Sequence, residues 1–516
     1  MKRHLPRLLW ATLLAVAAHT ALAQADDDGA RRRGPTEKAE RGERGGRGRQ
    51  PALVLPADVA ALDRLSVLLG RPTRDSVTLN VLSADRLEAV VEFASEGEAA
   101  WRRTPLRQLE PGEPAEIELT GLAPGRAQRY RLLSRRVGAE RFDTGAEHAF
   151  HTQRAPGEAF SFALQGDSHP ERGHQFDAAM YAQTLRAAAA DRPDFYLTLG
   201  DDFSVDTLPE LNAATVTQRY RLQRPFLALV GQSAPVFLVN GNHEQAAAAN
   251  LDGTPHNVAV WAQNARNRLY PQPAPNRFYS GDTLEVPHIG LLRDYHAWTW
   301  GDALFVVIDP YWHSPQPVDN ALGSRDKGGD KGGDTGGSKG GRDLWNNTLG
   351  EAQYRWLRET LTQSRAKYKF VFAHHVLGTG RGGAGLARLY EWGGQDRRGR
   401  DEFATRRPGW PEPIHALFVR TGVTIFFQGH DHVSARETLD GVIYQTVPEP
   451  ADPHEALYFA EAYPGAVVHP NSGHLRVSVD AQRVRVDYRR TAPPGAAPAS
   501  GPTSRADFSY EVPARR

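Results

Sequence analysis

The sequence predicts an all-β sandwich followed by a larger α/β domain. Two patterns support this: from about residue 53 to 152 apolar residues alternate with polar ones, whereas from Phe160 onward short continuous apolar runs alternate with helical stretches. A chain of 516 residues is also longer than one typical domain. We therefore expect a β-sandwich over residues 53–154 and an α/β domain over residues 157–490.

Period-two alternation defines the strands of the predicted sandwich. Val77, Leu79 and Val81 would face one side of a strand, and the segment 87–93 repeats the pattern. The segment 119–125, LTGLAPG, followed by Tyr130, resembles the fibronectin type III pattern, in which a tyrosine sits in a corner near the end of the sandwich. No cluster of catalytic side chains lies here, so we interpret the sandwich as a packing or positioning module.

Continuous apolar runs define the buried strands of the α/β domain. The stretches 176–190 and 351–364 between them have helical periodicity, and 442–447 and 475–488 are expected to be closing strands. The six runs are 160–164, 195–199, 236–239, 304–308, 370–373 and 423–427.

The N-terminus has the pattern of a secretory signal. Basic residues precede the apolar run 8–22, and Ala21-Leu22-Ala23 offers a cleavage site, so residues 1–23 are expected to be a signal peptide. The run is shorter than the ~20 residues of a membrane span and contains His19. We expect a secreted or periplasmic protein with no membrane span after cleavage.

Three segments have a composition typical of disorder. They are a basic, Gly-rich arm at 24–52, a low-complexity insertion at 323–342 and a Pro- and Ala-rich tail at 491–516. The chain has no cysteine, which excludes disulfides and thiolate metal sites, and its net charge of +1 gives no reason to expect a nucleic-acid partner.

Five of the six apolar runs end in side chains that bind metals. In open α/β sheets ligands bind beyond the carboxyl ends of the strands, so these clusters are expected to lie together. They are Gly166-Asp167-Ser168-His169, Gly200-Asp201-Asp202, Gly241-Asn242-His243-Glu244, Ala373-His374-His375 and Gly429-His430-Asp431-His432.

In this order the five clusters resemble the motifs DxH, GD, GNH[DE], H and GHxH of the calcineurin-like metallophosphoesterase superfamily. Segments 295–309 and 353–357, together with the sandwich ahead of the α/β domain, resemble its purple acid phosphatase branch. The resemblance implies a four-layer α/β/β/α sandwich with a dinuclear metal site. It also implies an acid phosphatase-like enzyme.

The resemblance also implies roles for individual residues. Asp201 would bridge two transition metal ions, of manganese, iron, zinc or nickel, and His375 is the nearest rival of His374 as a ligand. The first ion would be held by Asp167, His169 and His432, and the second by Asn242, His374 and His430.

The implied reaction is hydrolysis of a small-molecule phosphomonoester by hydroxide bound between two ions ~3.5 to 4 Å apart. His243 would face the substrate as a charge stabiliser or general acid, while Glu244 would orient its loop. The same site would serve a phosphodiesterase or nucleotidase. A non-catalytic surface-binding protein with a vestigial metal domain would have lost ligands, whereas all seven ligand positions and His243 are present.

The sequence departs from its relatives in two places. Ser204 stands where purple acid phosphatases have a metal-bound tyrosine, and their first motif lacks the histidine found here as His169, so the protein should not be purple. In protein-phosphatase relatives the position of Ser204 holds an Asp that pairs with the catalytic histidine. Asp202 or Asp206 is expected to take that role.

Overall fold

The computed structural model describes residues 53–319, 343–377, 380–492 and 504–515, all within the compact unit Arg49–Arg516. The predicted signal peptide, the basic arm and the insertion at 323–342 lie outside the described residues. Within these ranges, no helix has the length and hydropathy that a bilayer span needs.

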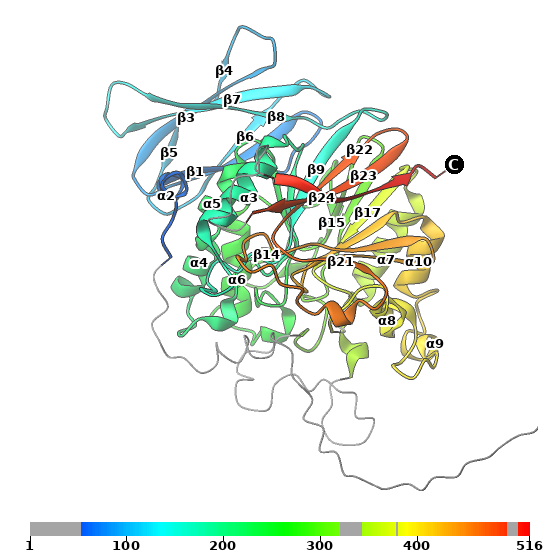
Figure 1. Ribbon diagram of the computed structural model, residues 1–516. Helices are drawn as coiled ribbons and strands as arrows, with labels where there is room; N and C mark the ends of the chain where they lie inside the picture. Colours follow the sequence, from blue (N-terminus) through cyan, green and yellow to red (C-terminus); the bar gives the residue numbers. More distant parts are fainter. Residues whose placement is uncertain (1–52, 320–342, 378–379, 493–503, 516) are drawn as a thin grey trace, which may run out of the picture. The chain divides into compact units, whose positions relative to one another are not determined.

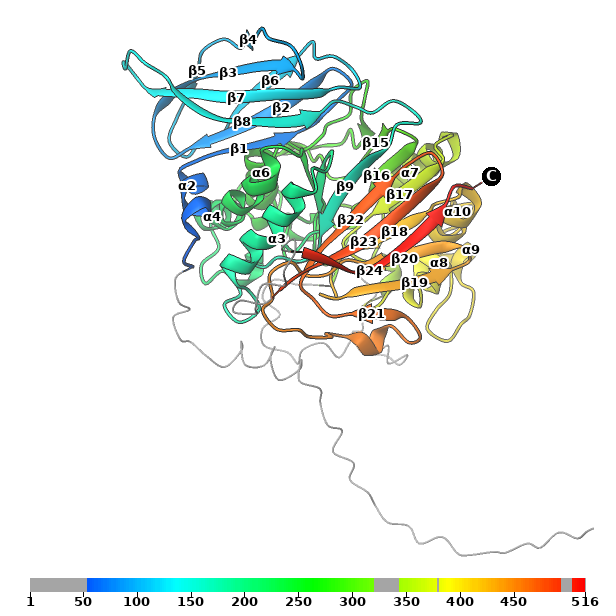
Figure 2. The same ribbon diagram turned by 45° about the horizontal axis from the view of Figure 1, so that its top comes forward.

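The first 100 described residues form a β-sandwich after the short helix α2 (Ala57–Arg64), as Figure 2 shows. One sheet has the order β1-β2-β6, and in the other β3 pairs with β4, β5 and β7, which pairs with β8. The bounds are β1 Leu65–Gly70, β2 Ser76–Ser83, β3 Leu87–Ser95, β4 Arg102–Arg103, β5 Arg107–Leu109, β6 Ala115–Thr120, β7 Ala127–Arg136 and β8 Asp143–His151.

Both faces of β1 and β2 are buried. Leu68 and Leu82 belong to the same apolar cluster as Phe226 and Leu227 of the α/β domain. The expected corner tyrosine also reaches out of the sandwich, because the Tyr130 hydroxyl donates a hydrogen bond to the Gln232 carbonyl oxygen at 2.8 Å. The sandwich therefore packs directly against the α/β domain and is hydrogen-bonded to it.

Two mixed sheets form the centre of the α/β domain. The first has the order β11-β10-β9-β22-β23-β24 and the second the order β12-β15-β16-β17-β18-β20-β19-β21. The strands of the first are β9 Phe160–Gln165, β10 Tyr196–Thr198, β11 Val236–Leu238, β22 Gly473–Val479, β23 Arg483–Thr491 and β24 Ser504–Pro513. Those of the second are β12 Ser280–Gly281, β15 His296–Trp300, β16 Ala303–Val307, β17 Tyr368–Phe372, β18 Ile425–Gln428, β19 Ser434–Leu439, β20 Val442–Thr446 and β21 Val467–His469.

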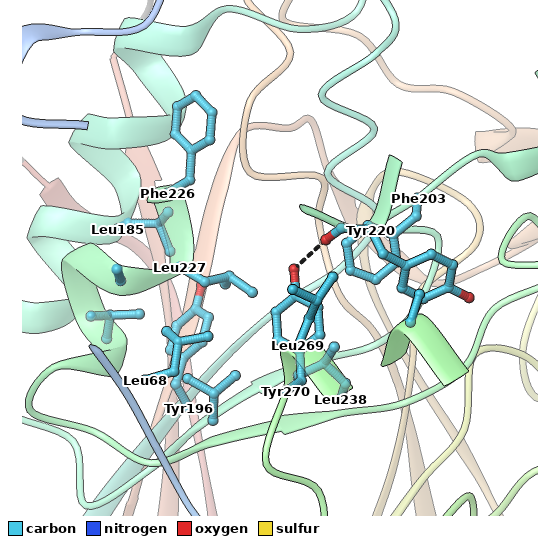
Figure 3. Packing of buried hydrophobic residues seen from close by; sticks show 14 of the residues in the cluster. Leu68, Leu185, Tyr196, Phe203, Tyr220, Phe226, Leu227, Leu238, Leu269 and Tyr270 are labelled. Atoms are coloured by element: carbon cyan, nitrogen blue, oxygen red, sulfur yellow. Dashed lines mark hydrogen bonds between the residues drawn. The ribbon is translucent and has the colours of Figure 1, made fainter. Parts of the chain in front are cut away.

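Helices cover the outer faces of the two sheets, on opposite sides in Figure 1 and Figure 2. The first sheet packs on α3 (Ala178–Ala190), α4 (Ala213–Leu222), α5 (Arg224–Gly231) and α6 (Val258–Leu269), through the cluster in Figure 3. The second packs on α7 (Gly350–Gln363), α8 (Tyr390–Gly393), α9 (Phe403–Arg406) and α10 (Ile414–Thr421).

The two sheets face each other across an aromatic core. Phe162 and Phe195 of the first sheet lie parallel, 5.5 Å apart between ring centroids, and Phe162 meets the edge of Phe305 of the second sheet. With one helical layer outside each sheet, the arrangement is the predicted four-layer α/β/β/α sandwich.

The prediction of a disordered tail from residue 491 is wrong for residues 504–513. These form β24, which pairs antiparallel with β23, and Tyr510 is buried with its hydroxyl 2.9 Å from Gln445 Oε1. The short alternation from Phe508 to Val512 was hidden by the Pro- and Ala-rich stretch before it. Residues 493–503 lie outside the described part.

Candidate metal centre

All five predicted clusters lie at the carboxyl ends of neighbouring strands. The first three follow β9, β10 and β11 of one sheet, and the last two follow β17 and β18 of the other. Because both sheets end at one edge of the domain, the clusters meet in space, as the strand-end rule predicts.

Two buried groups of side chains have the composition of cation sites. In each group the possible ligand atoms lie within 4.8 Å of one another. The groups are Asp167, His169 and His432, and Asp201, His374 and His430. The amide of Asn242, which is 6% exposed, completes the set predicted from the sequence.

Three ligand atoms in this set are buried without a hydrogen-bond partner among the described residues. They are Asp167 Oδ1, His169 Nε2 and Asn242 Oδ1. Burying such atoms unpaired costs free energy, whereas bound cations would supply the missing partners. The nitrogen and oxygen donors thus fit a pair of divalent transition metal ions.

Asp201 lies between the two groups. Its Oδ2 is 3.1 Å from His374 Nε2 and 3.9 Å from His169 Nε2. Its Oδ1 accepts a hydrogen bond from the His243 backbone N–H at 2.9 Å, which fixes the orientation of the carboxylate. This placement suits the bridging role that the resemblance implied.

Surrounding groups orient the histidine rings. His374 Nδ1 donates to the Leu199 carbonyl oxygen at 2.7 Å, and His169 Nδ1 is hydrogen-bonded to Ser204 Oγ at 2.9 Å. Both rings therefore present Nε2 to the centre. Ser204, which stands where purple acid phosphatases have a tyrosine, supports His169 here.

The motif glycines permit the loops to approach closely. A Cβ at Gly200, where φ is +91°, would lie 2.6 Å from the Gly241 nitrogen, and one at Gly429 would lie 2.6 Å from Asp167 Oδ2. The backbone is also strained here, because four motif residues have a positive φ: His169, Asp201, His430 and His432. Such conformations cluster at functional sites.

His243 lies at the open side of the centre, 22% exposed. Its Nδ1 is 2.9 Å from Asp206 Oδ1, and its Nε2 is 3.3 Å from Arg172 Nη2. Burial lowers the pKa of His243, but Asp206 and Asp201 outweigh it and raise this pKa to about 9. Of the two candidates for its partner, Asp206 therefore makes the contact, whereas Asp202 accepts hydrogen bonds from Gln223 and Ser168.

Glu244 holds the loop, as predicted. Its carboxylate accepts hydrogen bonds from the backbone N–H groups of Gly241 at 2.7 Å and Asp202 at 2.7 Å. It thereby ties the second and third clusters together.

Sequence reasoning missed several carboxylates that contact the predicted ligand histidines, among them Glu171, whose Oε1 is 3.4 Å from His169 Nδ1. Glu449 lies 2.8 Å from His432 Nδ1, and its place just after β20 at the same sheet edge was a usable signal. Asp319 Oδ2 lies 2.9 Å from His430 Nε2 and groups with His375, but no pattern around it marks it in the sequence. His375 thus lies beside the centre and remains the alternative to His374 as a metal ligand.

Comparisons with known proteins agree with this geometry. The calcineurin-like phosphoesterase family matches residues 160–434. A solved structure of PhoD has 16% sequence identity and a TM-score of 0.58, covering 87% of this chain and 90% of that chain. GAP50, the anchor in the inner membrane complex of Plasmodium, has 10% identity and a TM-score of 0.37, with 69% and 90% covered.

No curated protein sequence matches the chain. The family match spans more than half of the residues and contains all the ligand positions, while the likeness to PhoD confirms the fold. The chain therefore belongs to the calcineurin-like phosphoesterase family and is a metal-binding phosphoesterase.

Proposed function

We propose that the protein hydrolyses phosphomonoesters at a dinuclear centre bridged by Asp201. The observation that carries this is the position of the Asp201 carboxylate between two ligand groups, 3.1 Å from His374 and 3.9 Å from His169. Two bound ions would neutralise the phosphoryl oxygens and lower the pKa of a water molecule toward ~7.

The protein's own residues supply the proton. His243 is held through Nδ1 by Asp206, so Nε2, which lies 3.3 Å from Arg172 Nη2, is the ring nitrogen that can face a substrate. Burial lowers the pKa of His243 and the Asp206 carboxylate beside Nδ1 raises it, and this ion pair favours the protonated ring. It is suited to protonate the leaving alcohol oxygen as a general acid.

Two arginines favour a monoester over a diester. Arg172 lies beside His243, and the Arg381 guanidinium donates to the His430 carbonyl oxygen. The side chains of these arginines are 15% and 32% exposed, so both can meet a ligand. A phosphomonoester dianion offers them more charge than a diester monoanion.

We also propose that the enzyme acts after export, as a secreted or periplasmic protein. This rests on the basic, apolar and small-residue order of residues 1–23. A fusion of residues 1–30 to a reporter should be exported and cleaved near Ala23, whereas retention of an uncleaved fusion would contradict the proposal.

Metal reconstitution tests the proposed reaction. Residues 24–516 are stripped with chelator, and manganese, zinc, iron or nickel is returned singly with a phosphomonoester or phosphodiester of p-nitrophenol as substrate. Metal-restored hydrolysis, faster for the monoester, is expected. A faster diester reaction would favour the phosphodiesterase alternative, and no hydrolysis with any metal would favour a surface-binding protein.

An Asp201→Ala variant tests the bridge. It should lose both hydrolysis and metal, because it removes a ligand from each ion. Unchanged metal content and unchanged hydrolysis would refute the assignment of Asp201.

A further inference from the structure

A second group of acidic and imidazole side chains lies outside the phosphoesterase centre. Asp282, Asp294 and His313 have possible ligand atoms within 4.8 Å of one another. Asp282 follows β12, Asp294 precedes β15, and His313 lies beyond the end of β16. These three strands are neighbours at one edge of the second sheet, so three separate chain segments converge here.

The two carboxylates are buried and incompletely paired. Asp282 is 3% exposed and Asp294 is 1% exposed. Asp282 Oδ2 and Asp294 Oδ1 have no hydrogen-bond partner within the described part of the chain. Burial, followed by the charge of Asp294, raises the pKa of Asp282 to about 6. Two buried like charges side by side are costly unless something neutralises them.

The nearby arginine does not pair with these carboxylates. Arg266 donates from Nη1 to the Arg293 carbonyl oxygen at 3.1 Å and from Nη2 to the Leu238 carbonyl oxygen at 2.7 Å. His313 Nε2 lies 3.3 Å from Asp294 Oδ2, a long contact for an ion pair with a hydrogen bond. Asp282 also interacts with the Leu284 backbone N–H, which donates to its Oδ1 at 2.8 Å, and with the Tyr295 side chain. One oxygen of each carboxylate, Asp282 Oδ2 and Asp294 Oδ1, is left for a further ligand.

We propose that Asp282, Asp294 and His313 bind one divalent cation of the zinc or manganese type, separate from the phosphoesterase centre. Two carboxylate oxygens and one imidazole nitrogen suit such an ion, and solvent completes its coordination from the side of His313, whose side chain is 11% exposed.

This cation would brace the loop that holds the phosphoesterase centre. Asp309 lies between β16 and His313, and its Oδ2 accepts a hydrogen bond from Asn240 Nδ2 at 2.7 Å. Asn240 is two residues before Asn242 of the third cluster. A cation that links His313 to Asp294 at the start of β15 would also hold the Asp309 segment, which contacts the third cluster. Its role is therefore structural.

Metal content measured by plasma mass spectrometry tests the proposal. Asp282→Asn and Asp294→Asn chains, loaded with zinc and dialysed, should each hold one equivalent less than the unmodified chain. Asp302→Asn is the matched control, since Asp302 lies in the β15–β16 turn and already binds Lys367 Nζ at 2.8 Å. The Asp302→Asn control should lose no metal. The proposal would be overturned if Asp282→Asn and Asp294→Asn held as much metal as the control and the unmodified chain.

Two further variants keep the result interpretable. His374→Asn should release metal from the phosphoesterase centre but keep the equivalent held by Asp294, which separates this site from the proposed reaction. His313→Gln, which changes the least buried of the three side chains, should lose the same equivalent as Asp294→Asn even if the latter folds poorly. Full metal retention in His313→Gln would count against the site.

Thermal unfolding gives an independent readout. In chelator, Asp294→Asn should melt at or above the unmodified chain because it removes like-charge repulsion, and zinc should raise its melting temperature less. A lower melting temperature in chelator with an unchanged zinc effect would instead indicate two carboxyls that share a proton, and would overturn the proposal.

Discussion

At the scale of single residues, the centre differs from its relatives in how its histidines are held. In protein-phosphatase relatives the partner of the histidine that corresponds to His243 stands three positions after the residue that corresponds to Asp201, where this chain has Ser204. The one-turn helix η1 (Val205–Thr207) instead brings Asp206 to His243 Nδ1. Ser204 is thereby released to support His169.

Removing the proton donor should slow the reaction without releasing metal. His243→Asn is expected to lower kcat by about 10²- to 10⁴-fold, the usual contribution of a general acid. Asp206→Asn should give a smaller loss, because His243 remains but its ring is less firmly held. Steady-state kinetics with metal analysis checks this, and an unchanged kcat in His243→Asn would exclude the assigned role.

Removing the support of His169 should weaken metal binding. Ser204→Ala is expected to lower affinity at the first group by about 10- to 100-fold, as loss of an outer partner commonly does. The activity should recover at high metal concentration. Thr217→Ala is the control, because the Thr217 hydroxyl donates to the Ala213 carbonyl oxygen within α4, and this variant should titrate with metal like the unmodified chain.

At the scale of elements, the strands were predictable because continuous apolar runs are buried on both faces. Helix α3 and strand β9 begin and end within two residues of the expected bounds. The pairing partners were not predictable, since the side-chain pattern of β24 says nothing about which edge it joins. The support of His432 by Glu449 likewise depends on the packing of β20 beside β18.

Glu92 in strand β3 offers a test of how the free energy of unfolding depends on pH. Glu92 is 4% exposed and lies 2.5 Å from Arg103 and 2.6 Å from Arg131. Burial raises the pKa of Glu92, but the two arginines outweigh it and hold this pKa below 4.5. A depressed pKa adds stability above pH ~4.5 that is lost as the pH falls through the folded-state value.

Glu92→Gln should therefore be less stable than the unmodified chain at pH 7, by about 2 kcal/mol for a charged hydrogen-bonded group. The difference should shrink toward pH 3. Thermal unfolding at pH 7, 5 and 3.5 measures it, and a constant difference across this range would show that the arginines do not act through charge.

The C-terminal strand should contribute to the core between the sheets. Tyr510 packs in the aromatic core and bonds Gln445, so Tyr510→Ala is expected to cost about 3 to 5 kcal/mol. Tyr510→Phe keeps the ring and should cost about 1 kcal/mol. Equal urea midpoints for all three proteins would contradict the placement of β24.

At the scale of the whole described chain, the sandwich and the catalytic domain are joined by a buried arginine. Arg224, which begins α5 and is 1% exposed, donates from Nε to Ser66 Oγ at 2.9 Å and from Nη2 to the Asn80 carbonyl oxygen at 2.7 Å. Its third bond is to the Leu269 carbonyl oxygen at the end of α6. One guanidinium thus ties two strands of the sandwich to two helices.

Arg224→Ala should uncouple the two domains. Losing a charged donor from three buried acceptors is expected to cost about 3 kcal/mol and to divide one unfolding transition into two. Arg221→Ala is the control, because its contact to the Asp63 carbonyl oxygen is 3.4 Å long and lies nearer the surface. Calorimetry of both variants shows whether a single transition persists.

The position of β9 in the first sheet affects the order in which the protein folds during synthesis. One edge of β9 pairs with β10 early in the chain, but the other edge pairs with β22, in which Leu475 faces Leu164. During synthesis the sandwich can close long before this partner leaves the ribosome, while the first sheet keeps an open edge. Ligands from both halves of the catalytic domain therefore meet only late, so a nascent chain has no phosphoesterase centre until nearly all of it has been translated.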